Sequence, residues 1–255
     1  MHRSEVIGVL NKKRMNNRDL MSPEEAKKTL GNNLSFAAAE AYKLLRTNLN
    51  FSIPNGNGCK IIGVTSALKG EGKSTTSVNI AYTMAQEGGK VLLIECDLRL
   101  PTLAKRIQVN AAPGLSNFLV GECTSNDILQ KSGIKSNLWV VTAGDIPPNP
   151  AELLGSENMK TTIQTLKEYF DVIILDLPPL SAVSDALIVS KLVHGMVLIV
   201  RQGYCDRRSI DEAIHQLRFA DAKILGFVMT GANTLSKNYK RYGKSYGYYK
   251  QAQAK

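Results

Sequence analysis

The sequence lacks the features of a secreted or membrane-spanning protein. It has four cysteines among 255 residues, no Cys-x-x-Cys pair and no cluster of its three histidines. No apolar run approaches the ~20 residues that cross a bilayer, and the N-terminus lacks the apolar core of a signal peptide. We therefore expect a cytoplasmic protein with reduced thiols, and we assign no metal site to its cysteines and histidines.

Positive charge is in excess only at the two ends of the chain. The formal net charge is +10; residues 1–30 hold seven basic and four acidic residues, and residues 222–255 hold seven basic and no acidic ones. The segment between them sums to zero. A basic surface can bind nucleic acid, anionic lipid or an acidic protein segment, and it can also be merely solvated. Charge alone does not choose among these.

Three parts are expected along the chain. Residues 1–35 are polar and rich in asparagine and lysine, which is typical of a flexible basic arm. Residues 36–233 alternate apolar runs with helical patterns and are predicted to form one domain, beginning with a helix at Phe36–Phe51. Residues 234–255 have no apolar periodicity and are interpreted as a mobile, tyrosine-rich tail.

Six short apolar runs predict the strands of a sheet. They are Lys60–Thr65, Lys90–Cys96, Leu138–Ala143, Asp171–Asp176, Gly195–Arg201 and Ile224–Thr230. Their almost continuous hydrophobicity suits strands that are buried on both faces. The longest helical stretches between them are Ser74–Glu87, Asn158–Tyr169, Ser184–Val193 and Asp206–Phe219. This pattern predicts a doubly wound α/β domain with a mostly parallel sheet, whose ligands bind beyond the carboxyl ends of the strands.

A phosphate-binding loop is predicted between the first strand and the helix that follows it. Gly70 and Gly72 let successive backbone N–H groups point at phosphate oxygens, and the helix adds its positive N-terminal end. Lys73 is expected against the β- and γ-phosphates of ATP, and the Ser74 hydroxyl on Mg²⁺. The alternative is a Gly-Lys-Ser turn without a ligand, which the strand–loop–helix context disfavours. The predicted nucleotide-binding residues are Lys69, Gly70, Glu71, Gly72, Lys73, Ser74 and Thr75.

Acidic residues follow two of the predicted strands. Glu95 and Asp97 end the second strand, and Asp176 ends the fourth. A Mg-nucleotide site needs carboxylates placed by neighbouring strands. Asp97 and Asp176 are therefore functional candidates, whereas Glu95 could also be a strand-end charge that reaches solvent.

Several motifs occur in an order that resembles one protein family. They are Gly70–Thr75, Leu92–Arg99 with Pro101, Gly114–Ser116, Pro148–Leu154, Asp176 with Pro178 and Pro179, and the tyrosine-rich tail. From about Glu40 to its C-terminus, the chain resembles the cytoplasmic kinase domain of bacterial tyrosine kinases that control capsular and extracellular polysaccharide synthesis. The first acidic motifs are shared with the wider group of partitioning ATPases, so the resemblance implies a P-loop fold of the deviant Walker A group.

The resemblance also implies roles for individual residues. The acid at the Glu95 position helps to activate the substrate hydroxyl, and the acids at the Asp97 and Asp176 positions manage Mg²⁺. Subunits form a ring in which each tail enters a neighbour's active site. The segment containing Glu40, Lys43 and Arg46 matches the family's interface helix, with Lys43 in place of an arginine.

The same resemblance implies a partner protein and a location in the cell. Family members whose catalytic part is a separate chain depend on a transmembrane adaptor, a polysaccharide co-polymerase, whose cytoplasmic tail completes the active site. The expected location is therefore cytoplasmic, with recruitment to the inner face of the membrane by the adaptor.

Three positions depart from the family pattern. Glu95 stands for the usual aspartate and moves the carboxylate out by one methylene. Leu177 stands where serine or threonine commonly follows the second acid. Thr230 stands where asparagine commonly recognises the adenine, and Asn233 is the alternative for that role.

The tail carries five tyrosines within eleven residues, interleaved with lysine and arginine. Five exposed rings cannot serve a core, and a basic aromatic segment could also stack on nucleic acid bases. The resemblance favours autophosphorylation sites instead, with nucleic acid as an unlikely partner. The expected sites are Tyr239, Tyr242, Tyr246, Tyr248 and Tyr249.

Two other functions compete with an autokinase. One is a partitioning-type ATPase, but those proteins usually carry a second lysine at the position of Leu68. The other is a catalytically weak scaffold that binds nucleotide within a polysaccharide complex, which the residues at Glu95 and Leu177 leave open.

Overall fold

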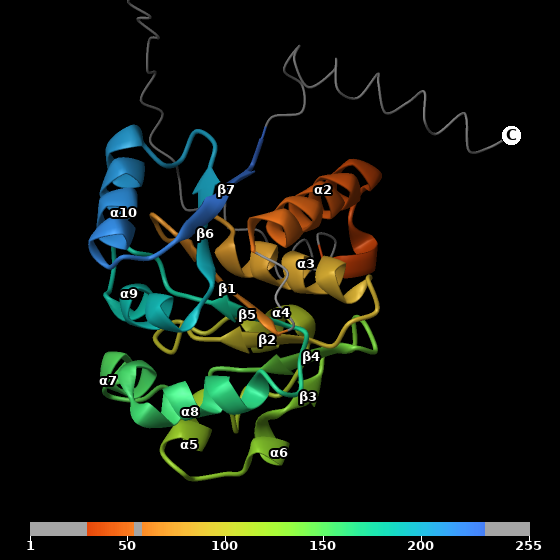
Figure 1. Cartoon of the computed structure of the whole chain (residues 1–255), viewed down its shortest axis with the longest axis vertical. Helices are drawn as coiled ribbons and strands as arrows, with labels where there is room; N and C mark the ends of the chain where they lie inside the picture. The colour runs from red at the N-terminus through yellow and green to blue at the C-terminus, as the bar shows by residue number, and fades with distance from the viewer. Residues whose placement is uncertain (1–29, 54–57, 233–255) are drawn as a thin grey trace, which may run out of the picture.

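The computed structural model describes residues 30–53 and 58–232. The expected tail, its five tyrosines and Asn233 lie outside the described residues, as do residues 1–29 of the expected arm. Within the described part, a central sheet is covered by helices on both faces (Figure 1).

The sheet confirms the doubly wound α/β prediction. Its seven strands lie in the order β3-β4-β2-β5-β1-β6-β7. All neighbours are parallel except β3 and β4, which are antiparallel. The strands are β1 (Lys60–Ser66), β2 (Val91–Glu95), β3 (Gln130–Lys131), β4 (Leu138–Val141), β5 (Val172–Asp176), β6 (Gly195–Arg201) and β7 (Ile224–Thr230). The predicted strands agree with these within two residues at each end, and β3 was not predicted.

Alternation along each strand divides the core into two clusters. In β1, Ile61 packs on one face and Ile62 on the other, and both are fully buried. In β2, Leu92 and Leu93 divide in the same way. Burial on both faces explains why these runs are almost continuously apolar in sequence.

Helices cover the two faces unequally. On one face lie α2 (Phe36–Ser52), α3 (Lys73–Ala85) and α4 (Leu103–Ile107). The other face is covered by α5 (Leu115–Leu119), α6 (Ser125–Ile128), α7 (Pro150–Gly155), α8 (Glu157–Leu166), α9 (Asp185–Val189) and α10 (Arg207–Phe219). Two short 3₁₀ turns, η2 (Gly31–Asn33) and η3 (Ser190–Leu192), complete the described elements. Figure 1 shows α2 lying over α3, away from α7 and α8.

The domain begins before the predicted boundary at residue 35. Leu30 is buried in the core cluster of α2 and α3, and the Gly31 N–H donates to Asn79 Oδ1 at 3.0 Å. Residues 30–35 therefore belong to the packed domain, because they close its edge beside α3, rather than to a flexible arm.

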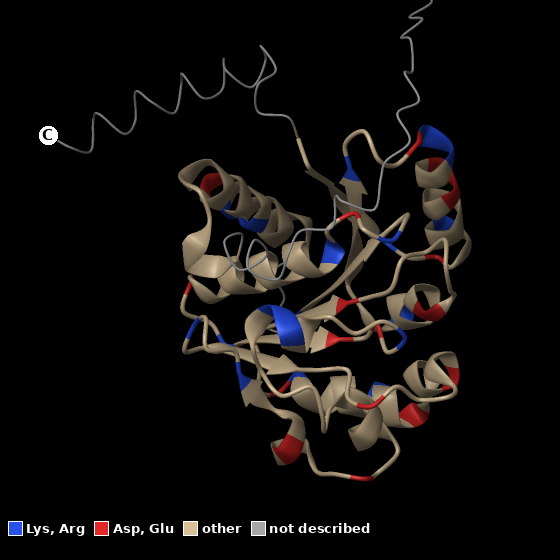
Figure 2. Ribbon diagram, turned by 180° about the vertical axis from the view of Figure 1, so that it is seen from behind, with Lys and Arg blue, Asp and Glu red and all other residues tan. Residues whose placement is uncertain are grey.

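The surface of the described part mixes both signs of charge. Acidic and basic residues share α10, whereas the charged residues of α4 are Lys105 and Arg106 alone (Figure 2). Among the described residues, no helix has the length and hydrophobicity to cross a bilayer.

Candidate functional site

The phosphate loop joins β1 to α3 at the carboxyl end of the sheet. Gly70 and Gly72 have φ angles of 89° and 91°, which side-chain-bearing residues rarely adopt. Within the described part of the chain, none of the N–H groups from Gly70 to Thr75 donates a hydrogen bond to protein. Unpaired N–H groups at a helix N-terminus form an anion site, so the loop fits the phosphates of a nucleotide.

Lys73 forms an ion pair with Asp97. Its Nζ lies 2.8 Å from Asp97 Oδ2, and the two side chains are 12% and 8% exposed. Burial by itself lowers the pKa of Lys73, but the charges of Asp176 and Asp97 outweigh burial, and the net result is a raised pKa. Lys73 is therefore a permanent cation at this site.

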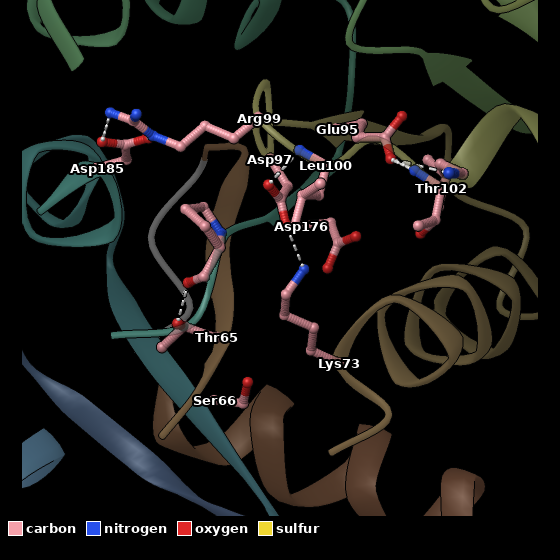
Figure 3. A network of polar contacts seen from close by, with 12 residues as sticks. Thr65, Ser66, Lys73, Glu95, Asp97, Arg99, Leu100, Thr102, Asp176 and Asp185 are labelled. Carbon is pink, nitrogen blue, oxygen red and sulfur yellow. Dashed lines mark hydrogen bonds and ion pairs between the residues drawn. The ribbon is translucent and has the colours of Figure 1, made fainter. Parts of the chain in front are cut away.

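Asp176 lies at the end of β5 beside this pair and is fully buried (Figure 3). Ser77 Oγ donates to Asp176 Oδ1 at 2.9 Å, whereas Asp176 Oδ2 is buried without a hydrogen-bond partner. A buried carboxylate oxygen without a partner is costly unless a cation or donor completes it. Together with the buried Ser74 and with Asp97, this oxygen makes the donor set a fit for Mg²⁺.

Glu95 is held by backbone N–H groups, away from Lys73 (Figure 3). Its Oε1 accepts from Thr102 and from Leu103, the latter at 2.8 Å, and its Oε2 accepts from Ala143 at 3.3 Å. Burial raises the pKa of Glu95 to about 7, although the backbone N–H groups oppose this rise. The alternative of a strand-end charge in solvent is wrong, because Glu95 is 1% exposed.

The loop after β2 is fastened to α9 by a pair that sequence reasoning missed. Arg99 Nε lies 2.9 Å from Asp185 Oδ2, and Arg99 Nη2 lies 3.1 Å from Asp185 Oδ1. Asp185 is fully buried, and its hydrogen bond to Arg99 raises the pKa of the Arg99 guanidinium. Because Asp97 lies two residues before Arg99, the pair fixes the segment that carries it.

Of the predicted loop residues, Lys69 is exposed, whereas Glu71 and Thr75 bind other parts of the protein through their side chains. Glu71 is fully buried and accepts from the backbone N–H groups of Leu68 at 2.7 Å and Arg201 at 3.1 Å. The Thr75 hydroxyl accepts from Arg106 Nη1 at 3.0 Å. The Glu71 carboxylate thus shapes the loop from within.

Leu177 and Thr230, which depart from the family pattern, are both bound within the protein. Leu177 is fully buried in the core on the α7–α10 side, so its side chain supplies no group to the site. Thr230, at the end of β7, donates its hydroxyl to Glu71 O at 2.6 Å. Thr230 is therefore bound to the phosphate loop.

The expected interface residues lie on α2. Lys43 Nζ pairs with Glu40 Oε1 at 2.7 Å. Arg46 Nη1 donates to Thr83 O at 2.9 Å, and Arg46 Nε lies 3.0 Å from Glu87 Oε1. Arg46 thus attaches α2 to α3 within one chain, and the role of the three residues between subunits stays a prediction.

Two loops cross in close contact beyond β4. A Cβ atom at Gly114 would lie 2.3 Å from Gly144 N, a distance that no side chain permits. Gly144 has a φ of 81° and is itself flanked by Asn117 Oδ1. The glycine of the Gly-Leu-Ser motif at this position is therefore explained by sterics.

Comparison with known proteins supports the assignment that the geometry suggests. A family model described as an AAA domain matches residues 59–217. The tyrosine-protein kinase YwqD of Bacillus subtilis is 40% identical over 190 residues, which cover 74% of this chain and 77% of that protein.

Solved structures agree with the sequence comparison. The kinase domain of the Escherichia coli tyrosine kinase ETK superimposes with a TM-score of 0.75 at 30% identity, covering 88% of each chain. The chimerical protein CapA2B2 gives a TM-score of 0.74 at 30% identity, covering 80% of this chain and 88% of that one. The septum site-determining protein MinD of Pyrococcus horikoshii, solved with Mg-ADP, shares the fold at 22% identity and a TM-score of 0.57, covering 67% and 70%. The chain therefore belongs to the bacterial tyrosine-protein kinases, and it shares its P-loop fold with MinD.

Proposed function

We propose that this kinase transfers the γ-phosphoryl group of MgATP to tyrosines in the C-terminal tail of a neighbouring subunit, and that it thereby regulates capsular or extracellular polysaccharide synthesis. The observation that carries the proposal is the cluster of Lys73, Asp97 and Asp176 at the phosphate loop. Such a cluster supplies positioning and charge neutralisation, which dominate phosphoryl transfer.

The chain's own residues account for nucleotide binding. Lys73 and the loop N–H groups bind the phosphates, and Ser74, Asp97 and Asp176 hold Mg²⁺ directly or through water. When bound, the metal neutralises charge that develops on the transferred group. The partnerless Asp176 Oδ2 supports this arrangement, because a cation would satisfy it.

Glu95 is proposed to orient or deprotonate the tyrosine hydroxyl. A pKa of about 7 is matched to proton transfer near neutral pH. Oε1 accepts two backbone N–H groups and Oε2 accepts one, so Oε2 keeps a lone pair for a substrate proton. Glu95 is 1% exposed, however, and a tyrosine hydroxyl reaches it only if the surrounding loops move. The same geometry favours the second candidate, a nucleotide-binding scaffold with weak catalysis.

Partners and location are proposed from the family. A transmembrane adaptor, of the polysaccharide co-polymerase type, would activate the kinase with its cytoplasmic tail and recruit it to the inner face of the membrane. Subunits would associate as a ring through α2, which presents Glu40 and Lys43. A related chain was solved as a chimerical protein, CapA2B2.

Phosphotyrosine detection tests the proposal. Purified protein is incubated with MgATP, with and without the adaptor's cytoplasmic segment, and probed with an anti-phosphotyrosine antibody. We expect signal in the wild type and in Lys160→Met, which removes an exposed lysine, and none in Lys73→Met or in a variant with the five tail tyrosines changed to Phe. A folded Lys73→Met protein that still labels itself refutes the site. A wild type that binds MgATP without labelling supports the scaffold instead.

A further inference from the structure

Three consecutive carbonyl groups of the phosphate loop accept hydrogen bonds from side chains of β6, of the turn that follows it, and of β7. Tyr204 Oη donates to Lys69 O at 2.9 Å, and Arg201 Nη1 donates to Gly70 O at 3.3 Å. Thr230 Oγ1 donates to Glu71 O at 2.6 Å. No other segment of the described chain supplies a side-chain donor to these three oxygens.

These contacts determine where the loop's N–H groups point. In a trans peptide unit the C=O and N–H bonds point in opposite directions. The single cis peptide bond in the described part of the chain is Ala112–Pro113, so all three units are trans. Carbonyls held toward β6 and β7 therefore turn the N–H groups of Gly70, Glu71 and Gly72 to the opposite side, where a nucleotide's phosphates are expected.

Two of the three donors lie on paired strands. Arg201 and Thr230 are register partners at the ends of β6 and β7, and Tyr204 follows in the next turn. The Arg201 guanidinium lies 5.5 Å from the centre of the Tyr204 ring, and the Arg201 N–H donates to Glu71 Oε1 at 3.1 Å. One small cluster thus binds both the backbone and the buried carboxylate of the loop.

The two loop glycines fit closely against this cluster. A Cβ atom at Gly70 would lie 3.2 Å from Tyr204 Oη, and one at Gly72 would lie 3.6 Å from Thr230 Oγ1. The contact is therefore tight at Gly70, where a side chain would displace the Tyr204 hydroxyl, and an ordinary van der Waals contact at Gly72.

We propose that Arg201, Tyr204 and Thr230 form a carbonyl brace, a set of positioning residues that holds the phosphate loop in its anion-binding conformation before the nucleotide arrives. Pre-organisation of this kind raises affinity because the loop no longer loses conformational freedom on binding. The proposal rests on the proposed nucleotide site, and it gives Thr230 a role in the loop rather than in recognition of the base.

Nucleotide titration tests the brace. The probe is MgADP, measured by calorimetry against the wild type, Thr230→Val, Thr230→Ser, Tyr204→Phe and the double variant Thr230→Val/Tyr204→Phe. Since one hydrogen bond contributes about 1 kcal/mol, each valine or phenylalanine variant is expected to bind about five-fold more weakly. The double variant is expected to lose at least the product of the two factors, and Thr230→Ser to stay within about two-fold of the wild type.

Matched controls separate positioning from general stability. Thr162→Val removes a hydroxyl that donates to a backbone carbonyl within α8, and Tyr169→Phe removes a hydroxyl from an exposed tyrosine. We expect both controls to bind MgADP as the wild type does, and the brace variants to show nucleotide-free Tm values within the range of the controls.

The outcomes distinguish the brace from the site itself. If the wild type binds MgADP and Lys73→Met does not, the proposed nucleotide site is supported. If, on that background, Thr230→Val and Tyr204→Phe bind as tightly as the wild type, or if Thr230→Ser is no better than Thr230→Val, the brace is refuted and the site stands. A wild type that binds no MgADP contradicts the proposed function and the brace together.

Discussion

Lys73 Nζ lies 2.8 Å from Asp97 Oδ2, so the residue expected to bind phosphate is paired with a residue expected to bind Mg²⁺. The pair keeps both charges satisfied when no nucleotide is present. When MgATP binds, Lys73 would leave Asp97 for the phosphates, and Asp97 would leave Lys73 for Mg²⁺. Both buried charges would therefore stay paired.

Breaking this pair is predicted to destabilise the nucleotide-free protein. Lys73→Met leaves Asp97 and Asp176 without a cation, and loss of one partner of a largely buried pair costs about 3 kcal/mol. Urea unfolding without nucleotide measures the loss. The double variant Lys73→Met/Asp97→Asn should lose less than the sum of the two single variants; strict additivity would contradict a direct interaction.

Asp176 is predicted to determine how strongly Mg²⁺ strengthens ADP binding. Its Oδ2 has no protein partner, so a metal-bound group can complete it. In the wild type, removal of Mg²⁺ with a chelator should weaken ADP binding about ten-fold or more, and in Asp176→Asn the effect should be much smaller. Calorimetry with and without the metal gives both values, and an unchanged metal effect in the variant would exclude Asp176 as a ligand.

The Arg99–Asp185 pair is predicted to stabilise the loop that carries Asp97. Arg99→Met leaves a fully buried carboxylate unpaired and should cost about 2 kcal/mol, less than for a fully buried pair because Arg99 is partly exposed. Lys160→Met, which breaks the exposed pair with Glu157, is the control and should change the free energy of unfolding by less than about 0.5 kcal/mol. Equal effects of the two variants would contradict the structural role.

His194 predicts a pH dependence of folding. Its Nδ1 accepts the Ile61 N–H at 2.9 Å, which requires an unprotonated nitrogen. Burial, followed by the charges of Lys167 and Lys223, lowers the pKa of His194. The unfolded chain therefore takes up the proton first, so the stability that is present above pH ~6.5 is lost as the pH falls below it.

Unfolding at pH 7.5 and 5.5 checks this sign. The wild type should lose more stability between the two pH values than His194→Gln does. His215→Gln, at an exposed position on α10, serves as the control and should follow the wild type. If His194→Gln loses as much stability between the two pH values as the wild type does, His194 is not the source of the pH dependence.

Phosphorylation of the tail is predicted to loosen the proposed ring. Residues 234–255 hold six basic and no acidic residues, and five phosphotyrosines would add about −8 to −10. The tail would then be repelled by a neighbour's nucleotide-loaded site. Sedimentation of variants with all five tyrosines changed to Glu or to Phe compares the two charge states, and equal assembly would exclude the switch.

Much of the fold could be predicted because burial leaves a signal in local sequence. The strand containing Val172 and Ile173 is apolar on both faces, and the phosphate loop has its glycines at fixed spacing. β3 could not be predicted, since two residues show no periodicity. The predicted helix at Ser184–Val193 is interrupted, because its last turn is the 3₁₀ turn η3.

Within the site, the acids were predictable from their positions after strands, but their partners were not. Asp185 is 86 residues from Arg99 in the chain, and Tyr204 is 135 residues from Lys69. Such pairs depend on how the strands are ordered in the sheet. Nor does the sequence distinguish an exposed Glu95 from one held by three backbone N–H groups, because the donors come from two other segments.

The contact between Gly114 and Gly144 gives a sequence criterion for relatives of this protein. Since the two backbones leave no room for a methyl group, a related chain with any side chain at the Gly114 position must separate the two loops. A side chain at this position therefore excludes the same path of the chain beyond β4, whereas a glycine is compatible with it. In a sequence without a solved structure, any residue other than glycine at that position would rule out the arrangement described for these loops.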